Sequence, residues 1–156
     1  MPHSVVDAAD DLLCSTNMEP EKITKALAGA EEGGIENLLA LRGDPPKGEE
    51  RWTATEGGFT CALDLVKHIK EKAGDKFGLS VAGYPEGHPN VIKKVEDPST
   101  MSESERGRAV TMEDGTYVCS DADFEKELAY LKEKVVAGAE FIVTQVRCAS
   151  ASHLRC

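Results

Sequence analysis

The chain has 156 residues, enough for one domain with a sizeable core, and a formal net charge of -10. A net negative charge does not support binding to the phosphates of a nucleic-acid backbone, so we expect no nucleic-acid partner. With 40% hydrophobic and 29% charged residues, the composition is typical of a globular protein. No apolar run approaches the roughly 20 residues of a membrane helix, and residues 1–11 lack the features of a secretory signal. We therefore expect a cytoplasmic protein without a membrane partner.

The cysteines and histidines indicate neither a disulfide framework nor a metal centre. The number of cysteines is odd, and the spacing of zinc ligands is absent among them. We therefore expect free thiols in a reducing compartment and no bound metal. The five positions are Cys14, Cys61, Cys119, Cys148 and Cys156.

Short apolar runs alternate with segments of helical periodicity along most of the chain. Residues 12–14, 38–41, 77–82 and 141–144 are predicted strands, with 38–41 buried on both faces. Three amphipathic helices are predicted between them, beginning near Pro20, Phe59 and Asp121 and ending at glycines 33–34, 74 and 138. Their apolar faces include Ile23 and Leu27, then Leu63, Val66 and Ile69, then Phe124, Leu128, Leu131 and Val135. Ser15, Thr16 and Asn17 are predicted to cap the first helix.

Residues 90–120 interrupt this alternation. The segment 102–108 is polar throughout, and two short apolar runs flank Glu113-Asp114-Gly115. This pattern predicts an inserted excursion with a small β-hairpin outside the core. The remaining order of strands and helices predicts an α/β fold with parallel strands. Two architectures fit it: a small doubly wound sheet, or about half of a (β/α)8 barrel.

Two of the predicted strands end in glycine- and proline-rich corners that carry polar side chains. The first is Arg42-Gly43-Asp44-Pro45-Pro46, and the second runs from Gly83 to Pro89. Ligands bind at the carboxyl ends of strands in parallel α/β folds, so both corners are candidate sites. A surface turn in which Arg42 and Asp44 pair with each other or with solvent fits the spacing equally well.

The two corners, in their strand context, resemble signature motifs of the methylenetetrahydrofolate reductase family. The matching stretches are Leu39-Ala40-Leu41-Arg42-Gly43-Asp44-Pro45-Pro46 and Val81-Ala82-Gly83-Tyr84-Pro85-Glu86-Gly87-His88-Pro89. Ser15-Thr16-Asn17-Met18, the segment 57–66 and the segment 131–145 resemble the family in the same order. The resemblance covers about residues 14–145.

This resemblance implies a fold and an activity. The fold would be a TIM barrel that binds FAD at the carboxyl ends of its strands, with this chain forming roughly strands three to six. The activity would be reduction of 5,10-methylenetetrahydrofolate to 5-methyltetrahydrofolate, with NAD(P)H as the hydride donor. We expect residues 12–145 to form the barrel segment, residues 146–156 a divergent tail, and the whole chain one partial domain. A homo-oligomer is compatible with the family.

The resemblance also assigns site residues. Asp44 and Gln145 are the expected catalytic positions, with Asp44 beside the flavin and the folate, and Gln145 at the pterin edge. Contacts with FAD are expected from the following residues: Thr16, Arg42, Gly43, Asp44, Ala62, Tyr84, His88 and Lys134. Val91 and Glu127 lie near further matching positions.

Ordinary structural roles compete with several of these assignments. Lys134 is by default a solvated lysine on a helix, and His88 a loop residue between Gly87 and Pro89. Gln145 could instead bond the backbone at the end of its strand.

The chain also departs from the family pattern. Strands one, two, seven and eight have no counterpart, and the first of these carries the family's expected general acid. Leu12 stands where many relatives have a histidine, and Glu133 replaces a usually basic residue near the flavin pyrophosphate. These departures leave a second hypothesis, a non-catalytic remnant that acts as a weak flavin-binding or interaction module. Both ends of the chain are expected to reflect truncation, a frameshift or mis-set gene boundaries.

Overall fold

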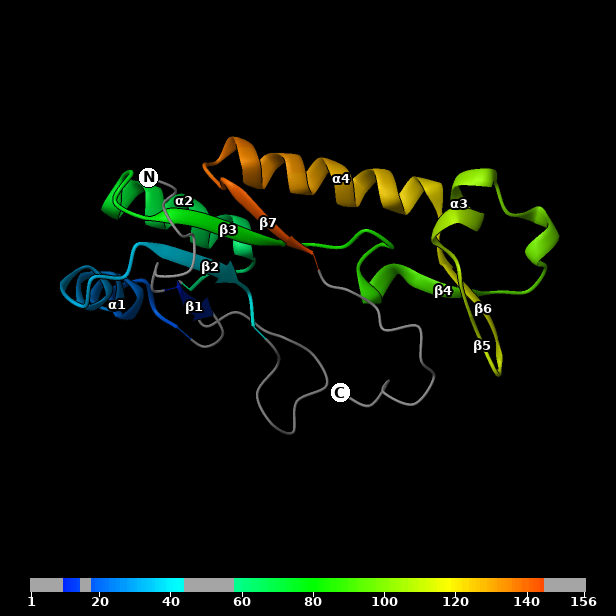
Figure 1. Cartoon of the computed structure of the whole chain (residues 1–156), viewed down its shortest axis with the longest axis horizontal. Coiled ribbons are helices and arrows are strands. Elements are labelled where there is room, and N and C mark those ends of the chain that lie inside the picture. Colours follow the sequence, from blue (N-terminus) through cyan, green and yellow to red (C-terminus); the bar gives the residue numbers. More distant parts are fainter. Residues whose placement is uncertain (1–9, 15–17, 44–57, 145–156) are drawn as a thin grey trace, which may run out of the picture. The chain divides into compact units, whose positions relative to one another are not determined.

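A computed structural model describes residues 10–14, 18–43 and 58–144 of the chain (Figure 1). These residues belong to two compact units. The first contains the residues up to Ala82 together with Glu133–Val143, and the second contains Gly83–Lys132 together with Thr144. None of the helices in the described ranges combines the length and the hydropathy that a bilayer crossing requires.

The first unit is built on a four-stranded sheet in the order β1-β2-β3-β7 (Figure 1). β1 pairs in parallel with β2, and β2 pairs in parallel with β3. The strands are β1 (Asp10–Cys14), β2 (Asn37–Leu41), β3 (Gly78–Gly83) and β7 (Phe141–Thr144). This arrangement confirms the predicted α/β class with parallel strands. The sheet is open within the described residues, so a closed barrel stays an expectation.

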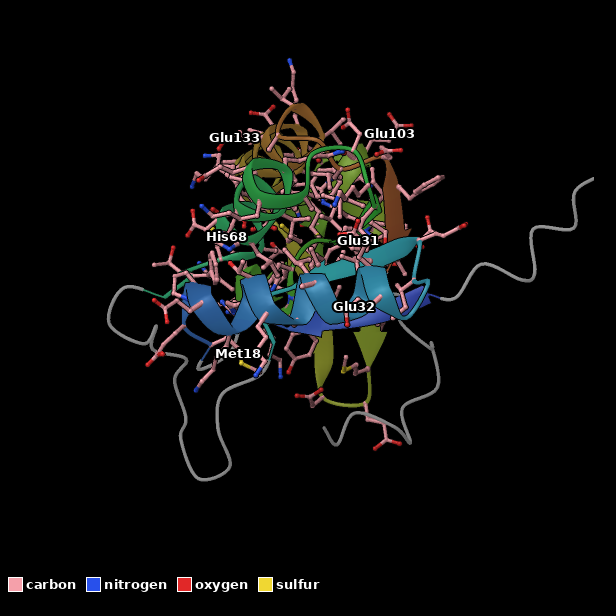
Figure 2. The ribbon with its side chains drawn as sticks, turned by 90° about the vertical axis from the view of Figure 1, so that its left-hand side faces the viewer. Met18, Glu31, Glu32, His68, Glu103 and Glu133 are labelled. Carbon is pink, nitrogen blue, oxygen red and sulfur yellow. The ribbon has the colours of Figure 1, made fainter. Side chains whose placement is uncertain are left out.

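Two helices, α1 (Pro20–Glu32) and α2 (Ala62–Ala73), complete the core of this unit. α2 packs against both α1 and β2. Ile23 and Leu27 from α1 are buried, as the helical spacing predicts, and so are Leu63, Val66 and Ile69 from α2. Figure 2 shows α1 with Met18 near its beginning and Glu32 at its end, and His68 of α2 beside it.

Three predictions about these elements are corrected. The N-cap of α1 is Glu19, without a side-chain cap, because Pro20, whose fixed φ suits the first helical position, begins the helix directly after it. Residues 15–17, the predicted caps of this helix, lie outside the described residues. β2 is not buried on both faces: Leu38 and Ala40 are buried, but the alternate residues are only half-buried. Phe59 is buried but precedes α2, which begins at Ala62.

The second unit contains the predicted hairpin and more secondary structure than the sequence indicated. β5 (Val110–Met112) and β6 (Gly115–Cys119) form the hairpin, and β4 (Ile92–Val95) adds a third antiparallel strand, giving the order β4-β6-β5. Two 3-10 turns, η1 (Pro89–Val91) and η2 (Pro98–Thr100), flank β4. The polar segment 102–108, for which the sequence predicts no element, contains a helix, α3 (Glu103–Arg108), which begins with a capping box.

The long helix α4 (Asp121–Val136) has the predicted bounds but not the predicted burial. Leu128 is 50% exposed and Val135 45% exposed, whereas the charged Lys134 is buried. The predicted apolar face is therefore covered only in part in the described structure, with Phe124 and Leu131 half-buried. Phe141, Ile142 and Val143 of β7 are exposed as well.

Candidate functional site

The first candidate corner begins where β2 ends. In register, Ala40 of β2 pairs with Val81 of β3, so the carboxyl ends of these parallel strands lie at the same edge. Arg42 follows β2 and is half-buried. Gly43 has a φ of +85°, a backbone conformation that L side chains rarely adopt, so the chain turns here at a glycine. Asp44, the predicted catalytic carboxylate, lies outside the described residues.

Lys134 reaches the same edge of the first unit from α4. Its Nζ donates a hydrogen bond of 2.8 Å to the carbonyl oxygen of Ala82, near the end of β3. The residue is only 5% exposed, which is rare for lysine. The default expectation of a solvated surface lysine is therefore wrong, and a cation lies at the carboxyl end of a central strand. Glu133, beside it in the sequence, is exposed.

The second corner follows β3 and belongs to the second unit. The N–H of Gly87 donates to the carbonyl of Tyr84 over 3.0 Å, which closes a turn with Pro85 at its second position. The rings of Tyr84 and His88 meet edge to face with centroids 4.7 Å apart. The turn therefore brings two predicted site residues into direct contact.

A hydrogen bond fixes the tautomer of His88. Nδ1 accepts from the backbone N–H of Asn90 over 3.2 Å, so this nitrogen carries no proton. In the neutral ring the proton is therefore on Nε2, which makes Nε2–H a donor. Tyr84 and His88 are both half-buried.

Ala62 lies at the first position of α2 and is half-buried. The first turn of this helix is closed by Asp64, whose carboxylate accepts from both the backbone and the hydroxyl of Thr60. The hydrogen bond from the Thr60 side chain lowers the pKa of Asp64, although burial opposes the shift. The carboxylate thus stays charged at the positive end of the helix dipole.

The predicted residues divide into three groups. Arg42, Gly43, Ala62 and Lys134 lie in the first unit, and Tyr84 and His88 lie together in the second. Thr16, Asp44 and Gln145 lie outside the described residues, so both expected catalytic positions stay predictions. Within the described ranges, no group of three or more His, Cys, Asp or Glu residues could hold a metal ion.

Comparison with known proteins identifies the family. The sequence profile described as methylenetetrahydrofolate reductase matches residues 3–155. The chain belongs to the methylenetetrahydrofolate reductase family. Among curated methylenetetrahydrofolate reductases, methylenetetrahydrofolate reductase (NADH) 1 of Arabidopsis thaliana is 48% identical over 134 residues, covering 86% of this chain and 19% of the relative.

Two other members of the methylenetetrahydrofolate reductase family show the range of similarity. Methylenetetrahydrofolate reductase 2 of Saccharomyces cerevisiae is 42% identical over 134 residues, covering 86% of this chain and 18% of the relative. The probable methylenetetrahydrofolate reductase (NADPH) of Caenorhabditis elegans is 33% identical over 122 residues, covering 78% of this chain and 13% of the relative. The chain therefore spans less than a fifth of the length of these relatives.

The resemblance recognised in the two corner motifs is thus confirmed at the level of the family. What the sequence missed is the environment of these motifs. Within the second unit, Cys119 is buried against Gly87 of the second corner, and the buried Arg108 bonds to the carbonyl of Cys119. The spacing of Ser102 and Glu105, a capping-box pattern, could have revealed the helix that carries Arg108.

Proposed function

We propose that this chain supplies part of the FAD- and folate-binding barrel of a methylenetetrahydrofolate reductase. The complete reaction is the reduction of 5,10-methylenetetrahydrofolate to 5-methyltetrahydrofolate with NADH or NADPH as donor. The observation that carries the proposal is the family match, which spans both strand-end corners. The names of the relatives include both nicotinamide donors, so the proposal extends to either.

The donor set at the end of β2 and β3 fits an anionic dinucleotide. Arg42 and Lys134 place two cations near this edge in a chain whose net charge is -10. A pyrophosphate is the part of FAD that such cations bind, and Lys134 is the residue we assign to it. Gly43 adopts a positive φ that favours glycine, and because glycine has no side chain, the backbone here could approach a cofactor closely.

Tyr84 and His88 supply neutral contacts in the second corner. A phenol and an imidazole with Nε2–H can both donate hydrogen bonds to ribose or phosphate oxygens. Their edge-to-face contact restricts both rings before any ligand binds, which lowers the entropic cost of ordering them.

Asp44 and Gln145 are assigned the roles closest to the chemistry. FAD, when bound, supplies the redox centre through which the nicotinamide donor reduces the folate. A carboxylate at Asp44 disfavours negative charge on the flavin ring and so tunes its potential. The amide of Gln145 can both donate to and accept from the pterin edge.

The proposal is tested by titrating the 156-residue chain with FAD and following flavin fluorescence. We expect a dissociation constant in the micromolar range or weaker, because Leu12 and Glu133 remove two polar or basic contacts that many relatives have. Each such contact contributes about 1 kcal/mol, and two together about a tenfold change or more.

Variants separate the contributions to this binding. We expect Tyr84→Ala and Lys134→Met to weaken FAD binding about fivefold or more, and Asp44→Asn to weaken it less. Lys134→Met keeps the aliphatic chain that packs in the core, so loss of charge is separated from loss of packing. Lys126→Ala is the matched control, because Lys126 is an exposed lysine on the same helix. Nanomolar binding, or variants indistinguishable from wild type, would show that the family assignments do not apply here.

A further inference from the structure

Cys119 at the end of β6 lies directly against the second corner. Its side chain is fully buried, and its strand pairs with β4, where Ile92 is its register partner. A Cβ added to Gly87 would lie 2.5 Å from Cys119 Cβ and 2.7 Å from Cys119 Sγ. Gly87 also has a φ of +97°. Both the conformation and the space at this position therefore require glycine.

The contact with Cys119 bears on the two rings of the corner because Gly87 lies between them. Its N–H closes the turn onto the carbonyl of Tyr84, and the next residue is His88, whose ring contacts that of Tyr84. The backbone of Asn90 then holds Nδ1 of His88. A shift of Gly87 toward the space of Cys119 would alter all three of these contacts, since they share one short stretch of backbone.

The backbone of Cys119 is itself held by Arg108. The Nε of Arg108 donates to the carbonyl of Cys119 over 2.9 Å, and its guanidinium lies 4.6 Å from the ring centroid of Phe124. The same guanidinium bonds to Ser104 over 2.7 Å and forms an ion pair with Asp121. Arg108 is 9% exposed and its hydrogen bond to Cys119 is buried, whereas Ser104 and Asp121 on its outer side are open to solvent. The end of β6 is thereby fixed to α3 and to the first turn of α4.

The Cys119 side chain acts here as a packing group. Burial raises the pKa of its thiol, which keeps the sulfur protonated and apolar at neutral pH. Its Sγ lies 3.6 Å from the carbonyl of Ser120, a weak hydrogen bond that orients it. The protonated thiol, held in one orientation, therefore forms a packing contact that limits where the backbone of Gly87 can lie.

We propose that Cys119 is a positioning residue that holds Tyr84 and His88 in their paired arrangement for cofactor binding. The inserted segment 90–120 then has a function, because its sheet and α3 hold Cys119 in place against Gly87 of the second corner. The inference rests on the proposed function only for the identity of the ligand, FAD. The bracing itself concerns the chain without ligand.

The test measures the tautomer of His88 and the affinity for FAD in the same variants of the 156-residue chain. Nitrogen NMR of histidine-labelled protein distinguishes a ring fixed as Nε2–H from one that exchanges between tautomers. In Cys119→Ala we expect the His88 signals to move toward tautomer averaging, and FAD binding to weaken about fivefold. Cys119→Ser, which keeps an atom at the position of Sγ, is expected to retain the wild-type signals and an affinity within about twofold.

Val118→Ala is the matched control, because Val118 is a buried neighbour on the same strand whose side chain points to the opposite face. It removes comparable bulk from β6 and should leave the His88 signals unchanged. Gly87→Ala disturbs the contact between Gly87 and Cys119 from the other residue, without altering β6. It is expected to change the His88 signals in the same way and serves as the test if Cys119→Ala does not fold.

The outcomes separate this inference from the proposed function. Unchanged His88 signals in folded Cys119→Ala and Gly87→Ala, or an equal change in Val118→Ala, would overturn the inference. So would altered signals without any loss of FAD affinity in a chain that binds FAD. If wild type binds no FAD, the proposed function fails, and the NMR comparison alone decides whether Cys119 positions the corner.

Discussion

His68 is held in one tautomer by the helix beside it (Figure 2). The hydroxyl of Thr24 donates its proton to the carbonyl of Pro20, so Thr24 Oγ1 must accept from His68 Nε2 across 3.1 Å. The ring of His68 also meets Phe59 edge to face at 5.0 Å. Burial lowers the pKa of His68, and the positive charge of Lys72 lowers it further, while Glu71 opposes the shift.

This lowered pKa predicts a loss of stability on mild acidification. The unfolded chain binds a proton at His68 near the ordinary pKa of 6.5, before the folded chain does. The contribution is therefore complete above pH 6.5 and is lost as the pH falls from 6.5 through the folded pKa. Urea unfolding of wild type and His68→Gln between about pH 8 and 5.5 measures it. The wild-type stability should fall more steeply with acidification, and parallel curves would contradict this account.

At the scale of the elements, the sequence predicts what depends on local signals. Periodicity and glycine punctuation correctly indicate β2, β3, α1, α2 and the bounds of α4. The six-residue α3 was missed because it has no apolar repeat and depends on its cap. The burial of Lys134 and the contact of Gly87 with Cys119 join residues distant in sequence, so no local pattern contains them.

The edge strand β7 exposes apolar side chains. Phe141 is 59% exposed, and Ile142 and Val143 are 46% and 42% exposed. An edge strand with exposed apolar side chains pairs readily with another chain, so we expect the 156-residue chain to self-associate. Light scattering of wild type and Ile142→Lys tests this, since a lysine on an edge strand opposes pairing. We expect oligomers for wild type and a shift toward monomer in the variant. A sharp monomer peak of wild type, stable for days at high concentration, would count against it.

At the scale of the whole molecule, the chain corresponds to a segment of much longer family members. Its match to the Arabidopsis thaliana relative covers 19% of that protein. The described sheet has four strands and is open, whereas the proposed active site needs strands from the rest of a barrel. We therefore expect this chain by itself to lack reductase turnover, even with added FAD.

A segment exchange tests whether this chain can form part of a working methylenetetrahydrofolate reductase. The 134 matched residues of the Arabidopsis thaliana relative are replaced by those of this chain, and reduction of methylenetetrahydrofolate is measured with NADH. Our account predicts turnover by the exchanged protein, its loss in the Asp44→Asn variant, and none by the 156-residue chain assayed alongside. An exchanged protein that folds and binds FAD but shows no turnover would contradict this expectation. So would reductase activity of the 156-residue chain by itself, if Asp44→Asn abolishes that activity.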